Sequence, residues 1–225
     1  MAVNSIPLRV QLKLMTKPSV VKKRIVSALV KELNRKWAHN TALHRLLNNG
    51  VANILLVGMQ QSPEYQSLVA NDGRLRQELG LRSPRALVDP IIDKASKTTH
   101  VVFTPLRAQG HRVTGQIRIT ALPNNFEDLL VAEPTASYTT SDENIVPWLD
   151  WMLRFGDRII IVGFELEYNP RRSRTGSFIM TPSPQSWRVP PEFSGVVGNN
   201  FITRAADFVA PQIANFMKNK LDGVL

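Results

Sequence analysis

The stretch that most constrains the fold is residues 148–180. Its first eight residues have apolar side chains at helical spacing, and Gly156 is the residue type that ends many helices in the left-handed conformation. Residues 158–168 are rich in Ile, Val and Phe, which predicts a strand buried on both faces at its start and on one face at its end. Pro170 interrupts this strand, and residues 177–180 are expected to return as its partner. A helix and a hairpin so close together indicate a fold that mixes α and β structure.

The loop of this hairpin is basic. Arg171, Arg172 and Arg174 lie between Pro170 and Gly176, so the hairpin is expected to hold guanidinium groups outward. Guanidinium groups bind phosphates and carboxylates through paired hydrogen bonds. A turn kept soluble by its charge is an equally good interpretation, and both stay open.

Positive charge is concentrated near the N-terminus. The chain has 225 residues and a net charge of +10, and its first 50 residues hold ten Lys or Arg and one acid, a net charge of +9. This concentration predicts a polyanionic partner, most often nucleic acid, and a solvated helix face is the alternative. The candidate DNA-facing or partner-facing residues are Lys22, Lys23, Lys31, Arg35, Lys36, Arg171, Arg172 and Arg174.

Residues 1–18 are predicted to form an N-terminal arm or an edge strand. Apolar residues occupy every second position in part of this segment, at Ile6, Leu8, Val10, Leu12 and Leu14. Alternation of this kind is typical of a strand with one buried face.

A long amphipathic helix is predicted from Val20 to about Leu47. Apolar residues recur there every four positions and form one stripe, at Val21, Ile25, Leu29, Leu33 and Trp37. Such a stripe normally faces a core. The turn-forming sequence at residues 48–50 is predicted to end the helix.

The remaining segments predict an α+β fold. Helices are expected at residues 51–61, after Ser62, at residues 74–81, after Ser83 and at residues 201–221, where Pro211 should kink or split the last one. Strands are expected at residues 98–104, 113–122 and 136–140. We therefore predict one domain, residues 1–225, with N-terminal helices and a C-terminal helix packed on a mainly antiparallel sheet of about four strands.

The segment 169–200 is predicted to comprise the protruding basic hairpin tip and an extended Pro-rich loop. Four prolines surround Trp187 in this loop, so the indole is expected either in the core or at a contact between subunits. The candidate residues for subunit contacts are Trp187, Pro190, Phe193 and Phe201.

Catalytic motifs are not found. The chain has no cysteine, so it has no disulfide and no thiolate metal site, and its four histidines lack the spacing of metal ligands. Glu165 and Glu167 share one side of a strand without a partner acid, base or metal, which favours a solvated face. No apolar run approaches the roughly 20 residues that span a bilayer, and no signal peptide is recognised. We expect no enzyme activity, no cofactor, no bound metal and no membrane contact, in a protein made in the cytoplasm.

Five short motifs occur in a recognisable order. They are SPEYQSL with GRLRQELGL within residues 62–81, RSRTGSFIM at residues 172–180, WRVPPEFSG at residues 187–195 and NNFITRA at residues 199–205. In these motifs, and in the order of its parts after about Val20, the chain resembles tailed-bacteriophage neck and tail-completion (head–tail connector) proteins. Residues 123–147 and the N-terminal arm do not contribute to the likeness.

The resemblance implies a structural protein of the virion without catalytic activity. It implies a homo-oligomeric ring, a hexamer, at the head–tail junction, assembled in the host cytoplasm. Its partners would be copies of itself, the head–tail connector or another portal-associated protein, a tail terminator or tail tube protein, and the genomic DNA in the lumen. Either the basic helix or the Arg171–Arg174 tip would face the DNA or an acidic ring.

A free nucleic-acid-binding protein, such as a regulator or packaging factor, is the alternative function. The N-terminal charge supports it, but no helix-turn-helix spacing or RNA-type aromatic motif is found. A nuclease or another enzyme is a third possibility, which metal-dependent turnover would reveal.

Overall fold

The chain folds into helices and antiparallel strand pairs, an α+β structure. The structure, a computed structural model, describes residues 18–36, 39–109, 112–120, 126–132, 134–139, 143–173 and 176–222. Its contacts divide the chain into two compact units: unit 1 comprises residues 1–40 and 103–118, and unit 2 comprises residues 41–102 and 119–225. The single domain expected for residues 1–225 stays a prediction, and the arm lies outside the described residues.

Helices supply most of the regular structure. They are α1 (Pro18–Lys36), α2 (Thr41–Gln61), α3 (Pro63–Val69), α4 (Arg74–Glu78), α5 (Pro84–Lys97), α6 (Glu127–Ala132), α7 (Trp148–Arg154) and α8 (Phe201–Asp222), with a short 3-10 helix, η1 (Pro134–Ala136). The strands are β1 (His100–Gln109), β2 (Arg112–Thr120), β3 (Tyr138–Thr139), β4 (Ile145–Val146), β5 (Ile161–Tyr168) and β6 (Phe178–Trp187). Among the described residues the strands form three separate pairs, β1–β2, β3–β4 and β5–β6, instead of the predicted single sheet.

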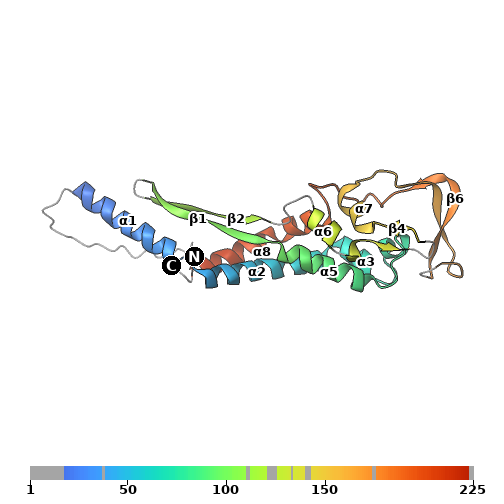
Figure 1. Ribbon diagram of the computed structural model, residues 1–225, viewed down its shortest axis with the longest axis horizontal. Helices are drawn as coiled ribbons and strands as arrows, with labels where there is room; N and C mark the ends of the chain where they lie inside the picture. Colours follow the sequence, from blue (N-terminus) through green and yellow to red (C-terminus); the bar gives the residue numbers. More distant parts are fainter. Residues whose placement is uncertain are drawn as a thin grey trace. The chain divides into compact units, whose positions relative to one another are not determined.

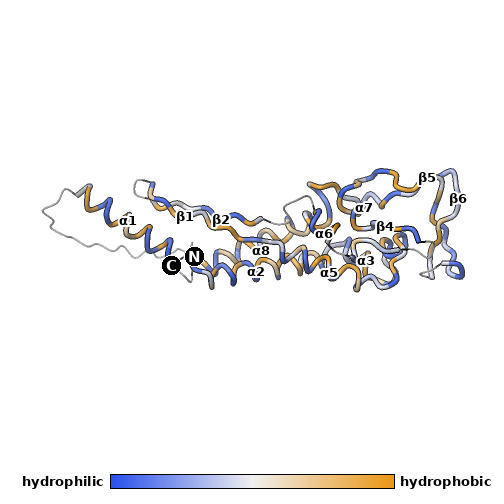
Figure 2. Tube along the Cα trace, viewed as in Figure 1, coloured by the Kyte–Doolittle hydropathy of each residue, from blue (hydrophilic) through white to orange (hydrophobic). Residues whose placement is uncertain are grey.

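The long helix predicted from Val20 to Leu47 is two helices. Helix α1 ends at Lys36, and α2 begins at Thr41 and continues through residues 48–50, which were expected to end the helix. The apolar stripe of α1 is also less buried than predicted, because Ile25 and Leu29 are 57% and 48% exposed. Figure 2 shows apolar and polar residues alternating along α1. Trp37, the last residue of the predicted stripe, lies outside the described residues.

Helices α2 and α8 pack side by side in unit 2 (Figure 1), and two glycines of α2 allow the close approach. A Cβ atom at Gly50 would lie 2.0 Å from the Cζ atom of Phe216 on α8. A Cβ atom at Gly58 would lie 2.4 Å from Cγ1 of Val209, which is buried. The Phe216 ring of α8 thus occupies the space that a side chain at position 50 would need, and this explains a glycine inside α2. The local turn propensity of residues 48–50 does not reveal this packing.

Replacing Gly58 by Val should weaken the contact between α2 and α8. The added side chain overlaps buried Val209, and overpacking of this kind costs about 1–3 kcal/mol. Asn53→Val is a matched control, because Asn53 is exposed on the same helix and Asn and Val have similar helix propensities. Urea unfolding of both variants measures the difference, and equal losses of stability would contradict the packing that we describe.

Helix α8 continues past Pro211 to Asp222, so the predicted split does not occur, while a kink at Pro211 stays a prediction. Proline removes the hydrogen bond to the carbonyl four residues earlier, at Asp207. Both Asp207 and Pro211 are exposed, so water can reach the carbonyl that loses its partner. The exposed side of the helix therefore tolerates the proline.

The segment 148–180 forms the predicted helix and hairpin. Helix α7 is followed by Gly156, whose φ of 61° is the expected left-handed conformation, and β5 pairs antiparallel with β6. Strand β6 is longer than predicted and continues to Trp187. The prediction that the hairpin's first strand is buried on both faces at its start is wrong, since Val162 is 76% exposed. Among the described residues β5 has β6 as its one partner strand, and apolar side chains such as Val162 and Tyr168 contact solvent.

Candidate interaction surfaces

A basic surface lies on α1 in unit 1. The side chains of Lys22, Lys23, Lys31, Arg35 and Lys36 are all exposed. Arg35 forms an ion pair with Glu32, with 2.6 Å between Nη2 and Oε1. The hydrogen bond between them lowers the pKa of the Glu32 carboxyl and raises the pKa of the Arg35 guanidinium, so both are charged at neutral pH.

Apolar and basic side chains of α1 are adjacent. Ile25 and Leu29 are exposed beside the lysines, and a hollow of about 630 Å³ is lined by Lys22, Lys23, Val26, Val30 and Ala108 among others. The hairpin of unit 1 is held to the helix by the amide of Asn34, which donates to the Leu106 carbonyl (3.1 Å) and accepts from its N–H (2.7 Å). Helix α1 thus combines a solvent-exposed apolar stripe with a strongly positive surface.

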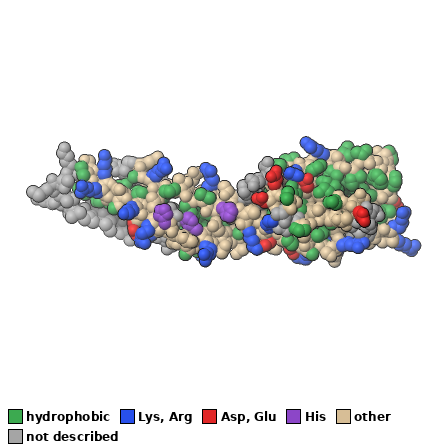
Figure 3. Space-filling view, in the orientation of Figure 1, with side chains coloured by type: hydrophobic (Ala, Val, Ile, Leu, Met, Phe, Trp, Pro, Cys, Tyr) green, Lys and Arg blue, Asp and Glu red, His purple; other side chains and the backbone are tan. Residues whose placement is uncertain are grey.

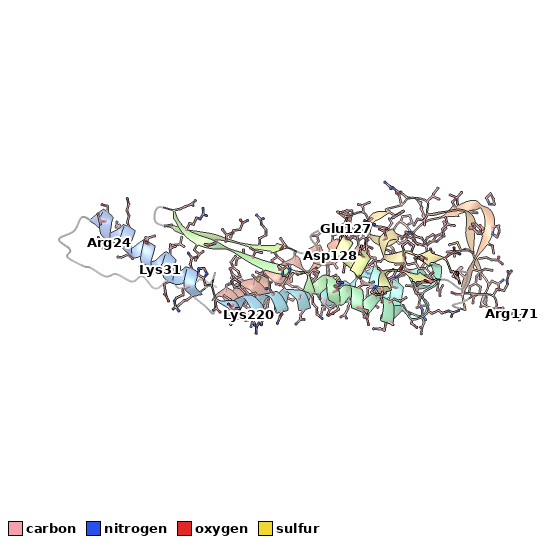
Figure 4. All side chains as sticks on the ribbon, in the orientation of Figure 1. Arg24, Lys31, Glu127, Asp128, Arg171 and Lys220 are labelled. Carbon is pink, nitrogen blue, oxygen red and sulfur yellow. The ribbon has the colours of Figure 1, made fainter. Side chains whose placement is uncertain are left out.

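A second basic surface is the tip of the β5–β6 hairpin in unit 2. Arg171 and Arg172 are exposed, and Arg171 lies at one end of the unit in Figure 4. The turn is held by Asn169, whose carbonyl accepts from the backbone N–H groups of Arg172 (3.2 Å) and Ser173 (2.9 Å). Arg174 lies outside the described residues. The hydrogen-bonded turn therefore exposes the guanidinium groups of Arg171 and Arg172 to solvent, as predicted.

The Pro-rich segment is anchored in the core of unit 2 by a few of its side chains, while Pro182, Pro184 and Pro191 are exposed. Trp187 is buried, its Nε1 donates to Oε2 of Glu78 (3.1 Å), and its ring lies 5.7 Å from that of Trp151. Pro190 is also buried, and Phe201 has no exposed surface. Of the four side chains predicted to contact other subunits, Phe193 is half-buried and the other three are buried within the protomer. For Trp187, the core position was one of the two expected.

Ion pairs fix this loop to the helices. Arg74 binds Glu78 on its own helix (2.6 Å) and Glu192 in the loop (2.5 Å). Arg204 of α8 binds Glu64 of α3 (2.6 Å) and donates to the Ser194 carbonyl (3.3 Å). The Arg74–Glu192 and Arg204–Glu64 pairs could not be predicted from the sequence, because their members are far apart in the chain.

Asn200 determines where α8 begins. Its side chain is buried, and Oδ1 accepts from the backbone N–H groups of Ile202 (3.1 Å) and Thr203 (3.2 Å). Its Nδ2 donates to the Val196 carbonyl (3.0 Å), and its own N–H donates to Oγ1 of Thr203 (2.8 Å). This is a reciprocal N-terminal cap, and the signal was present in the sequence as Asn followed by Thr three residues later.

The two faces of the β5–β6 pair differ in chemistry. Directly paired residues share a face, so Phe164, Leu166 and Tyr168 of β5 lie on one face with Met180 and Phe178 of β6. Glu165 and Glu167 lie on the other face. Tyr168 is 66% exposed, and Figure 3 shows hydrophobic side chains gathered at the end of unit 2 that carries α7 and β5–β6. The protomer therefore leaves an apolar sheet face accessible.

Within the described residues, no three His, Asp or Glu side chains are grouped so that they could hold a metal ion. In the same part of the chain, no helix is both long and apolar enough to cross a membrane. Comparison with protein-family models, curated proteins and solved structures finds no significant match to the chain.

Proposed function

We propose that this chain is a structural subunit of the neck of a tailed-bacteriophage virion. Copies of it form a ring, a hexamer, that joins the head connector to the tail around the DNA channel. The motif resemblance described above is the source of this proposal. The ring contacts itself, a portal-associated protein above, a tail terminator or tail tube protein below, and genomic DNA in the lumen.

The apolar face of β5–β6 is the observation that best supports a role in assembly. Tyr168 and Phe164 of this face are 66% and 38% exposed, and among the described residues no third strand pairs with β5 or β6. A two-stranded sheet is marginally stable by itself, and contiguous apolar surface on a protomer marks a site of protein–protein contact. If the chain is a subunit of a larger assembly, this apolar surface is covered by a neighbouring protein, which explains why the protomer alone leaves it exposed.

The basic residues support a location beside DNA or an acidic ring. Six cations of α1, with Arg24 among them, and two of the hairpin tip are exposed to solvent. Contacts from such residues to phosphates carry no sequence information and weaken as salt rises. A lumen lined in this way can hold DNA of any sequence.

Reversing the charge of the hairpin tip should block the joining of heads to tails. Arg171→Glu with Arg172→Glu changes two exposed side chains, so the fold and stability are expected to stay within about 0.5 kcal/mol of wild type. Counting infectious particles and inspecting them by electron microscopy measures the joining. Lys218→Glu with Lys220→Glu is the matched control, an equal charge change away from the tip (Figure 4). Normal infectivity of the tip variant would refute the role of the tip.

Immunogold electron microscopy tests the location itself. Antibody against this chain should label the head–tail junction of particles from the producing cell. Finished particles without label, with the chain free in the lysate, would instead support the alternative of a free regulator or packaging factor.

The exposed cations of α1 are the observation that favours this second candidate. Titration of duplex DNA at two salt concentrations separates the two functions. Tight, sequence-dependent binding by the isolated chain indicates the regulator. Weak binding that salt abolishes, or no binding, agrees with the neck subunit.

A further inference from the structure

Strand β5 has an edge that can accept another strand. Among the described residues β5 pairs with β6 alone, so the hydrogen-bonding groups on its other edge face no strand. The outer edge of β6 is protected, because Pro182 and Pro184 have no N–H to donate. Strand β5 contains no proline. A register shift at Gly163 interrupts β5, so the hairpin has one blunted edge on β6 and one open, regular edge on β5 from Phe164 to Tyr168.

An added strand would have to match both faces of β5. One face carries Phe164, Leu166 and Tyr168, and the ring of Tyr168 meets that of Phe178 at 5.6 Å. The other face carries Glu165 and Glu167. Cross-strand neighbours are most stable when apolar residues meet apolar residues and opposite charges meet. A matching strand is apolar on one face and basic on the other.

Residues 8–14 of this chain have that pattern. Apolar Leu8, Val10, Leu12 and Leu14 alternate with Arg9, Gln11 and Lys13. Because side chains alternate between the two faces of a strand, an extended conformation puts four apolar residues on one face and both cations on the other. The segment lacks proline, and its seven residues are close to the eight of β5.

We propose that residues 8–14 of a neighbouring copy add to the open edge of β5 as a third strand. The apolar residues of this arm extend the face of Phe164, Leu166 and Tyr168. Arg9 and Lys13 then lie beside Glu165 and Glu167, directly opposite or diagonal to them. Backbone hydrogen bonds supply affinity, and the alternating side chains set the register.

That the arm comes from a neighbouring copy rests on the proposed function, in which the chain is a subunit of an assembly. A ring repeats one contact between unlike surfaces from each subunit to the next. An arm on one copy and an open strand edge on the next are such a pair of unlike surfaces. Each copy has one of each, so the contact uses every arm and every edge.

Cross-linking tests the contact directly, because the chain has no cysteine of its own. Leu8→Cys, Val10→Cys and Leu12→Cys are each co-expressed in the full chain with a second copy that carries Leu166→Cys. After assembly, in solution or in isolated particles, oxidation should give a covalent dimer between the two variants for at least one arm position. The control partner is Val131→Cys, an exposed position on α6 that should give no such dimer.

Charge reversal tests the register of the two strands. Arg9→Glu with Lys13→Glu should weaken assembly by roughly tenfold, because two attractive pairs become repulsive. Adding Glu165→Lys with Glu167→Lys should restore it. Arg82→Glu with Lys218→Glu makes the same change in net charge at exposed positions and should leave assembly unchanged. Analytical ultracentrifugation measures the assembled fraction.

The outcomes separate the inference from the proposed function. A wild-type chain that neither assembles in solution nor occurs in particles contradicts the proposed function. Normal assembly without a cross-link at any arm position overturns the inference and leaves the proposed function standing. Cross-links that form only when both cysteines are in one chain place the arm on its own hairpin, which overturns the exchange between copies.

Discussion

Phe201→Ala should lower the free energy of unfolding by about 3–5 kcal/mol. Phe201 is the first residue of α8 and has an exposed fraction of 0%. Truncation removes a large apolar side chain from the core and leaves a cavity, since the surrounding helices relax only in part. Urea or thermal unfolding of the purified chain, followed by circular dichroism, measures the loss.

Phe208→Ala is the matched control on the same helix. Phe208 is 65% exposed, so its truncation should cost less than about 1 kcal/mol. The comparison also decides the role of Phe201, which the sequence analysis named as a candidate for subunit contact. If Phe201→Ala weakened assembly but left the stability of the protomer unchanged, the core position described here would be wrong.

Arg204→Ala should destabilise the fold by about 2–4 kcal/mol, because it leaves a buried carboxylate without its cation. The Glu64 side chain is almost fully buried and receives hydrogen bonds from Nε (3.0 Å) and Nη2 (2.6 Å) of Arg204. About one third of the Arg204 side chain is exposed, so solvent screens the ion pair and the expected loss of stability is smaller than for a fully buried pair. The substitution also removes a donor to the Ser194 carbonyl.

A double-mutant cycle isolates the interaction between the two charges. Glu64→Gln with Arg204→Ala should cost clearly less than the sum of the single substitutions, since the neutral amide needs no cation. Arg188→Ala is the control, because Arg188 and Asp157 are both exposed and the Arg188 Nη1 atom lies 3.6 Å from Oδ2 of Asp157. Chemical unfolding of all variants supplies the free energies. Strict additivity in the cycle would show that Glu64 and Arg204 do not stabilise one another.

Local signals in the sequence located several helix boundaries correctly. A helix was expected after Ser62, and α3 begins there with the Ser62 hydroxyl accepting from the N–H of Tyr65 at 3.1 Å. Gly156 takes the left-handed conformation that was expected of it after α7. These features depend on groups within a few residues of each other, so they can be predicted without knowledge of the fold.

The candidate surfaces were predictable to different degrees. Exposure of Arg171 and Arg172 follows from the cost of burying an unpaired charge, and the structure agrees. Burial of Trp187 could not be separated from a subunit contact, because an aromatic residue between prolines suits either position. Trp187 is held in the core by a hydrogen bond from its indole to Glu78, and Glu78 is too distant in the sequence for this contact to be predicted.

The sequence by itself determined the α+β class, the concentration of charge near the N-terminus and the hairpin with its basic tip. Each depends on composition or on side chains close together along the chain. The tertiary structure alone decided that α2 runs through Gly50 and that the described strands form three pairs in place of one sheet. It also decided that Phe201 is in the core while an apolar face of β5–β6 stays open. The physical reason is that burial is set by which distant segment covers a side chain, and helical or strand periodicity is the same whether or not that cover exists.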